Sequence, residues 1–268
     1  MSVRCCLRGF LCLLAAALPL EARAAKLILN EYNAVSASSY LNGGTAAVDD
    51  DGGAAADAFF GRVLGNGGDW FELVVVADHL DVRGWKLDLC DNGVCNEQLV
   101  FSQDPLWADL RAGTIITVAE DVPTDASYDP ANGDWWINIQ AIDGGPSTYI
   151  TPNSFPVSND NWQLTIHDAA NGLVFGPAGE GVQPVTGINN REVWKLEADP
   201  SAAITPVSFY NDGSSSSFGS PNRWNGGANV QHFSALRAAV PEAEGLTLFG
   251  VALVGLLSAA RARAPRAA

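Results

Sequence analysis

The feature that most constrains the fold is a series of short segments in which apolar and polar residues alternate. A period of two is typical of β-strands with one buried face, and the 3.6-residue period of helices is hard to find. Runs rich in Gly, Asn, Asp and Ser separate the segments, as turns separate antiparallel strands. The strands that this pattern predicts are 26–32, 70–77, 82–90, 95–102, 114–119, 135–141, 162–167, 172–176 and 192–196.

Short strands joined by turns favour an antiparallel β-sandwich, because a parallel α/β fold needs helices between its strands. The best helix candidate, 54–64, is weak. The chain is 47% hydrophobic with 8 Trp and only 17% charged residues, which is enough apolar material for a core and argues against disorder. We therefore expect an all-β body at 25–238.

The first 24 residues have the layout of a secretory signal peptide. Arg4 and Arg8 precede an apolar run at 10–20, and Ala22-Arg23-Ala24 places small residues where a signal peptidase cuts. The alternative is a buried N-terminal helix. We expect a signal helix that directs export and is removed.

Residues 239–268 have the layout of a second targeting signal. Val240, Pro241 and Glu242 precede an apolar stretch at 246–260, and three arginines follow it. This layout resembles the PEP-CTERM sorting signal, although Ala243 stands where that family has Pro. The resemblance implies an exosortase as processing partner, a transient hydrophobic helix in the inner membrane, and delivery to the outer surface or beyond. An ordinary C-terminal membrane anchor is the alternative.

The charge of the body excludes one class of partner. The whole chain has 15 basic and 30 acidic residues, a net charge of -15. Leaving out residues 1–24 and 240–268 removes six Arg and three Glu, so 9 basic and 27 acidic residues remain and the net charge is -18. Phosphate backbones repel such a surface, so we expect no nucleic acid partner.

Two cysteines remain in the body, Cys90 and Cys95. They flank Asn92-Gly93, the preferred pair for a two-residue hairpin turn, which would place them opposite each other at about 4.5 Å between Cα atoms. That separation suits a disulfide, and an exported protein meets oxidising conditions. A zinc site is the weaker alternative, because no His or third Cys is near.

Several segments of the body resemble the lamin tail domain, and this resemblance implies an immunoglobulin-like sandwich. Relative to that family, 34–68 and 104–158 would be insertions. The matching motifs are the Asn30-Glu31 pair at the end of 27–32, Trp70-Phe71-Glu72-Leu73, Gly84-Trp85-Lys86-Leu87, the hairpin 164–172 and Phe218-Gly219-Ser220-Pro221-Asn222.

No constellation for catalysis is found. The chain has no Gly-x-Ser-x-Gly elbow and no phosphate loop, and its three histidines lack metal-ligand spacing. Strand alternation places Glu72 on an otherwise apolar face. We interpret it as a structural carboxylate held by hydrogen bonds, in preference to a catalytic residue. His167 is expected to be a solvated hairpin residue. We therefore predict a non-enzymatic protein without a resident cofactor.

Two sites for ligands are candidates. Asp49, Asp50 and Asp51 could hold Ca²⁺ through carboxylate oxygens, although a solvated acidic loop is favoured. Strand alternation turns Trp136, Asn138 and Gln140 away from the core, where a sugar ring could stack on the indole and bond to the amides. The alternative is that a neighbouring loop covers Trp136.

Together these observations predict an exported, cell-surface or matrix-associated module for adhesion or binding, linked to extracellular polysaccharide. Two alternatives stay open. One is an extracellular hydrolase of nuclease or phosphatase type, which would need a catalytic domain for which the β pattern leaves little room. The other is a calcium-dependent carbohydrate-binding protein.

Overall fold

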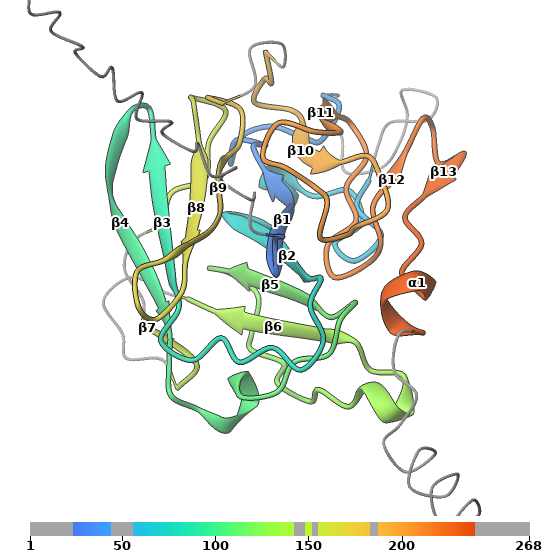
Figure 1. Cartoon of the computed structure of the whole chain (residues 1–268). Helices are drawn as coiled ribbons and strands as arrows, with labels where there is room; N and C mark the ends of the chain where they lie inside the picture. The colour runs from blue at the N-terminus through green and yellow to red at the C-terminus, as the bar shows by residue number, and fades with distance from the viewer. Residues whose placement is uncertain (1–23, 44–55, 142–147, 152–154, 183–186, 239–268) are drawn as a thin grey trace, which may run out of the picture.

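The computed structural model describes residues 24–43, 56–141, 148–151, 155–182 and 187–238. Two β-sheets and a small two-stranded hairpin make up this part of the chain (Figure 1). Its helical elements are short: α1 (Ser234–Arg237) and the 3-10 turns η1 (Leu64–Gly67), η2 (Pro105–Trp107) and η3 (Pro130–Asn132). The prediction of an all-β sandwich is confirmed.

The larger sheet has six strands in the order β11-β10-β1-β2-β5-β6. Its central strands lie deep in the molecule, and every residue of β1 and β2 is buried. The strands are β1 (Leu27–Asn33), β2 (Trp70–Val75), β5 (Ile115–Ala119), β6 (Trp136–Gln140), β10 (Val193–Leu196) and β11 (Tyr210–Gly213).

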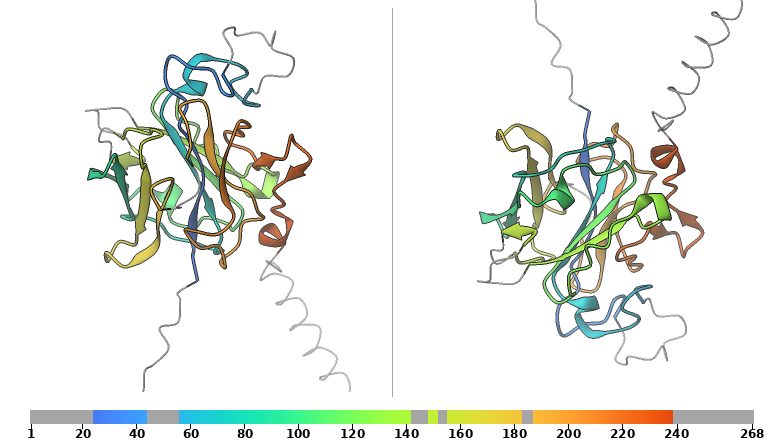
Figure 2. Two further views of the ribbon diagram at one scale, coloured as in Figure 1. Left: turned by 90° about the horizontal axis from the view of Figure 1, so that it is seen from above. Right: turned by 90° about the horizontal axis from the view of Figure 1, so that it is seen from below.

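The smaller sheet has five strands in the order β7-β4-β3-β8-β9, all paired antiparallel. Its strands are β3 (Lys86–Asp91), β4 (Val94–Phe101), β7 (Ile150–Thr151), β8 (Gln163–His167) and β9 (Leu173–Ala178). The hairpin β12 (Arg223–Trp224) and β13 (Asn229–Val230) and helix α1 lie on the far side of the large sheet from the five-stranded one, as Figures 1 and 2 show.

The expectation of a wholly antiparallel sandwich is wrong at one edge, because β5 and β6 run parallel. Parallel neighbours need a crossover connection, and residues 120–135 with η3 provide it. Two further differences concern strand limits. The strand expected from residue 82 begins at Lys86, after a turn in which Gly84 has φ +72°, and the short β7, β11, β12 and β13 were not predicted.

The core between the two sheets is aromatic and apolar. Tyr32 and Phe71 from the large sheet contact Trp162, which directly precedes β8, with ring centroids 4.4 Å and 5.9 Å apart. All three side chains have no exposed surface. Aromatic side chains bury about 150–250 Å² each, so this contact is a main source of stability.

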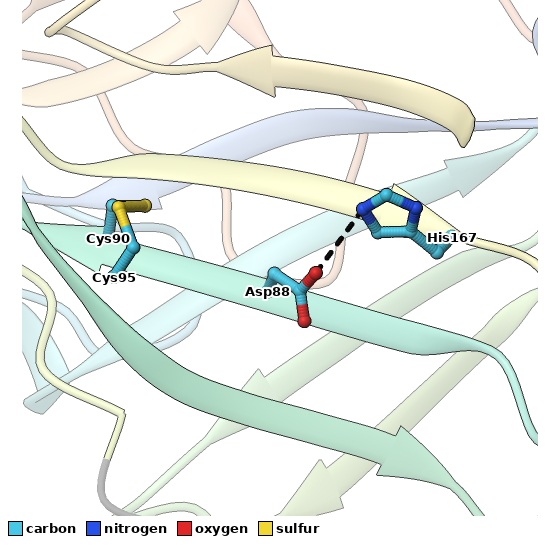
Figure 3. The surroundings of a disulfide bond; sticks show 4 residues. All are labelled: Asp88, Cys90, Cys95 and His167. Carbon is cyan, nitrogen blue, oxygen red and sulfur yellow. Dashed lines mark ion pairs between the residues drawn. A yellow bond between two sulfur atoms is a disulfide. The ribbon is translucent and has the colours of Figure 1, made fainter. Parts of the chain in front are cut away.

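The hairpin between β3 and β4 carries the predicted disulfide, with an S–S distance of 2.02 Å and Cα atoms of Cys90 and Cys95 4.0 Å apart (Figure 3). Asn92 and Gly93 both have positive φ, as the two-residue turn requires, and Asp91 pairs with Val94. Figure 3 also shows His167 on β8 facing Asp88 on β3, with Nε2 and Oδ2 3.2 Å apart. His167 is thus half-buried and paired across strands.

One of the two predicted insertions contributes strands to both sheets. Residues 104–158 supply β5, β6 and β7, so both sheets depend on them. The described part of 34–68 forms turns and η1 beside the large sheet. In the part of the chain that the structure describes, no helix is long and apolar enough to cross a membrane, and the predicted segment 246–260 lies outside it.

Candidate functional site

A row of polar side chains crosses the outer face of the six-stranded sheet, the face turned away from the smaller sheet. The row exists because strand register aligns one polar residue from each of five neighbouring strands. None of these residues is more than 1% exposed. In order across the sheet they are Lys195, Glu31, Glu72, Thr117 and Asn138.

A β-bulge between Leu29 and Glu31 adds Asn30 to this face. Its Nδ2 donates to Glu72 Oε1 at 2.6 Å, and its Oδ1 accepts from Gln231 Nε2 at 2.9 Å. The other carboxylate oxygen of Glu72 accepts from the Gly219 amide at 2.9 Å, and Asn222 Nδ2 donates to the Asn30 carbonyl at 3.0 Å. Three motifs that are distant in sequence therefore meet in one hydrogen-bond network.

The electrostatics of the row follow from its burial. Loss of water raises the pKa of Glu31 to about 8, and the nearby charge of Lys195 only partly opposes this shift. Neither carboxylate oxygen of Glu31 has a hydrogen-bond partner of good geometry among the described residues. Burial, and then the neighbouring Glu31, also raise the pKa of Glu72 well above its usual value. Both carboxyls thus favour the neutral form.

Lys195 is held at the other end of the row. Its Nζ donates to the Arg223 carbonyl at 2.7 Å and to two oxygens of Ser215, and burial lowers its pKa. The network ties segment 215–231 to the sheet. Because loops cover the network and its polar groups, apart from the Glu31 carboxyl, bond within the protein, the network is structural. For Glu72 this agrees with the interpretation preferred from sequence.

The sugar-binding face expected at Trp136 is not open. Trp136 packs against Phe59 and Phe218 with ring centroids 5.6 Å and 5.8 Å away, and its Nε1 donates to Thr117 Oγ1 at 3.0 Å. Asn138 has no exposed surface, and its Nδ2 donates to the carbonyls of Val122 and Pro123. The prediction that Asn138 is exposed is wrong, because segments from elsewhere in the chain cover this face.

Gln140, the third predicted residue, is half-buried at the end of β6. Its Nε2 donates to the Glu120 carbonyl at 2.8 Å. Trp136, Asn138 and Gln140 therefore do lie on one strand face, as alternation predicts, but their polar groups already bond within the protein. The alternative given from sequence, that a neighbouring loop covers Trp136, describes the arrangement.

The tryptophans differ in what their indole N–H groups do. Those of Trp70, Trp107, Trp136 and Trp162 donate to protein oxygens at 2.7–3.0 Å. Trp135 and Trp224 are half-buried, and among the described residues their N–H groups have no acceptor. Both side chains line surface pockets. A partly exposed indole with a free donor is the kind of group that a polar ring compound can use.

The Trp135 pocket, as we call it, has a volume of about 420 Å³ and lies where η3 and α1 meet the start of β6. Its lining combines two aromatic rings with charged groups that could bond to a ligand. The residues are Asp109, Arg111, Tyr128, Asp129, Pro130, Ala131, Trp135 and Arg237. Sequence alternation had placed Trp135 on the core side, but it precedes the first residue of β6 and so lies outside the strand pattern.

Arg237 closes one side of the Trp135 pocket. Its guanidinium lies 4.6 Å from the centre of the Trp135 ring and 4.9 Å from that of Phe233, and its Nη2 donates to the Gly113 carbonyl at 2.9 Å. Burial lowers the pKa of this arginine. Cation–π contacts are worth about 0.5–2 kcal/mol each, and the contact with Trp135 together with the bond to Gly113 holds α1 beside the large sheet.

A second group of charges borders the Trp135 pocket. Arg111 Nε donates to Asp78 Oδ1 at 2.9 Å, and His79 Nδ1 lies 2.7 Å from Asp109 Oδ1. Burial raises the pKa of Asp78, but the hydrogen bonds from Arg111 and the Ala112 amide, together with the nearby positive charge, outweigh this effect, so the net pKa is lowered. Tyr128 is fixed by hydrogen bonds to Thr114 and to the Arg111 amide. The pocket walls are thus preorganised.

The remaining candidates lie outside the described residues. These are Asp49, Asp50 and Asp51 of the calcium hypothesis and Val240, Pro241 and Glu242 of the sorting signal. Within the described ranges, no group of three or more His, Cys, Asp or Glu is placed to hold a metal ion. Comparison with models of protein families, with curated proteins and with solved structures finds no match to this chain.

Proposed function

We propose that this protein is an exported, non-enzymatic module of the cell surface or matrix that binds extracellular polysaccharide through the Trp135 pocket. The observation that carries the proposal is the pocket itself, in which the half-buried rings of Trp135 and Tyr128 lie beside charged side chains. Sugars present apolar ring faces and hydroxyl groups, and such walls can contact both.

Export is supported by three features. The hairpin disulfide suits an oxidising compartment. Residues 1–24 have the composition of a signal peptide, and residues 239–268 that of a PEP-CTERM-type sorting signal. In this proposal an exosortase-type enzyme processes the C-terminal segment after the chain has been anchored transiently in the inner membrane.

The sandwich is proposed to be of the lamin-tail, immunoglobulin-like type. Support comes from the buried network, in which Asn30, Glu72, Gly219 and Asn222 from three of the resembling motifs bond to one another. In this proposal the motifs that contain these residues have a structural role, since each satisfies buried polar groups of the others. Binding is left to surface loops, which is where the Trp135 pocket lies.

The test is binding of the full chain to the exopolysaccharide of its own host. We expect Trp135→Ala to weaken binding at least about tenfold, because an aromatic stacking platform is lost. Asp109→Asn, a change at an exposed pocket residue, should weaken it less. Trp136→Phe is the matched control and should leave affinity unchanged. Binding that is absent in the wild type, or equal in wild type and Trp135→Ala, would reject the proposal.

One observation favours the hydrolase alternative. His79 and Asp109 form a close pair at the rim of the Trp135 pocket, and such a pair can move a proton. The protein would then release reducing ends from the polysaccharide or phosphate from p-nitrophenyl phosphate. If the wild type turns over either substrate and His79→Ala does not, this alternative is established. If the wild type is no more active than His79→Ala, it is rejected.

A calcium-dependent mode of binding is tested separately. If Asp49, Asp50 and Asp51 hold Ca²⁺, added calcium should raise the melting temperature and a chelator should lower it. The triple change of these residues to Asn should remove both effects. Binding to polysaccharide that survives chelation would reject a calcium requirement.

A further inference from the structure

A second pocket, the Trp224 pocket, lies beside the hairpin β12–β13. It has a volume of about 330 Å³, and Trp224, Asp199, Asn229 and His232 are among its lining residues. It repeats the chemistry of the Trp135 pocket, with a half-buried indole, a carboxylate and further polar side chains. Among the described residues the Trp224 indole N–H has no acceptor, and no other aromatic ring stacks on it.

The two pockets are joined by one short segment. His232 lines the Trp224 pocket, Phe233 follows it, and Arg237 lines the Trp135 pocket. Arg237 lies over both Phe233 and Trp135, so the segment is continuous with both sites. Five residue steps span at most about 18 Å, which sets an upper limit on the distance between the His232 and Arg237 Cα atoms.

The spacing between the pockets is fixed at both ends. Gln231, just before His232, donates through Nε2 to Asn30, to Leu196 and to Ala198, and so anchors the segment in the buried network. The His232 amide donates to Asp199 Oδ1 at 2.7 Å. At the other end Arg237 bonds to the Gly113 carbonyl. Figures 1 and 2 show β12, β13 and α1 on the same side of the large sheet.

We propose that the Trp135 and Trp224 pockets are two subsites of one extended site, whose ligand is a saccharide chain long enough to contact both tryptophans at once. This inference rests on the proposed function and adds the second subsite and the length of the ligand. Occupying one pocket raises the effective concentration of the chain at the other, so affinity depends on chain length. Because the distance between the pockets is fixed, affinity should rise abruptly, in a step, at one chain length. Shorter chains reach only one pocket.

The experiment measures affinity of the full chain for a size-fractionated ladder of partial-hydrolysis fragments of the host's exopolysaccharide. For the wild type, affinity should rise about tenfold or more once fragments reach both pockets. Trp224→Ala should lower affinity for long fragments by a similar factor and remove the step, while short-fragment binding at Trp135 persists. His232→Ala changes an exposed side chain of the same pocket, so it should not disturb folding. It should also reduce the rise in affinity with fragment length.

Trp136→Phe serves as the control that changes a tryptophan outside both pockets. If Trp224→Ala and His232→Ala leave long-fragment affinity unchanged while Trp135→Ala abolishes it, the second subsite is wrong and the proposed function stands. If the wild type shows no step with fragment length, the extended site is likewise rejected. If the wild type binds no fragment of any size, the proposed function itself fails.

Discussion

The two faces of the six-stranded sheet use the same strands for different purposes. On the inner face, Tyr32 and Phe71 pack against Trp162 of the other layer. On the outer face, the neighbouring residues Glu31 and Glu72 are equally buried but polar. Hydrophobic burial is non-directional and stabilises many arrangements, whereas a buried polar network tolerates few. The inner face should therefore contribute the larger part of the stability, and the outer face a smaller part together with the positions of the covering loops.

The buried polar residues of the outer face and the candidate binding pockets lie in different places. The outer face holds Glu72, Asn138 and Gln140, which stand out in the sequence, yet their polar groups bond to residues of segments 120–123 and 219–222 or to Asn30. The two pockets lie at its margin, where η3, α1 and the β12–β13 hairpin meet solvent. Substitutions on the inner face, on the outer face and at the hairpin should therefore have effects of decreasing size on stability.

The largest effect should come from the inner face. Phe71→Ala removes a fully buried ring that contacts Trp162 and Phe155, and we expect a loss of about 3–5 kcal/mol in the free energy of unfolding. Denaturant unfolding followed by tryptophan fluorescence measures it. A loss below about 1 kcal/mol would mean that the sheets are not packed through this contact.

The outer face should make stability depend on pH. The folded-state pKa of Glu31, about 8, lies above its ordinary value of 4.5, so its contribution is complete below pH 4.5 and is lost as pH rises toward 8. The loss should be of the order of a few kcal/mol. Other charged groups also face Glu31, and their charges affect how its contribution to the free energy of unfolding changes with pH. These groups are Glu72, Asp57 and Lys195.

The matched variant for this pH dependence is Glu31→Gln, which cannot ionise. Its free energy of unfolding should fall less steeply than that of the wild type between pH 4.5 and 8. This difference isolates Glu31 from the general repulsion within an acidic protein. Parallel curves for the two proteins would contradict the assignment.

Glu72 offers a sharper test of the outer network. Glu72→Ala leaves the Gly219 amide without its acceptor and removes the closer of the two acceptors of Asn30 Nδ2, which keeps only Asn222 Oδ1 at 3.2 Å. This should cost about 2 kcal/mol. Glu72→Gln keeps an acceptor and should cost less, because the carboxyl that it replaces already favours the neutral form. Thermal unfolding of both variants measures the difference. Equal losses in the two variants would contradict this account, because an isosteric side chain that keeps one acceptor would then give no benefit over Ala.

The smallest effect should come from the disulfide. It closes a loop between residues only five apart, so Cys90→Ser with Cys95→Ser should lower the free energy of unfolding by about 2 kcal/mol or less. Calorimetry with and without a reductant measures this for the wild type as well. A loss as large as that of Phe71→Ala would contradict the small contribution expected for so short a loop.

Much of the fold follows from local sequence. Alternation predicts the main strands, and Asn92-Gly93 predicts the hairpin and its disulfide, because these features depend on residues close together in the chain. The structural role of Glu72 is also predictable, since a carboxylate on an apolar strand needs partners. Its partners Asn30 and Gly219 are not, because they come from a bulge and a distant loop.

The candidate site was less predictable. Alternation correctly turns Trp136 away from the inner core, but it carries no information on Phe59 and Phe218, which cover that side chain. The alternation that predicts a core position for Trp135 does not apply to it, because β6 begins one residue later. The parallel pairing of β5 and β6 and the approach of Arg237 to Trp135 are long-range features that no periodicity encodes.

The most direct test of the account is to follow the indole N–H signals of the 8 tryptophans by NMR while the host's exopolysaccharide is added to ¹⁵N-labelled protein. Trp→Phe variants assign the signals. The account predicts that the Trp135 signal shifts or broadens while those of Trp70 and Trp136, which donate to protein oxygens, stay in place. A shift of Trp136 with Trp135 unchanged, or no change in any indole signal, would contradict it.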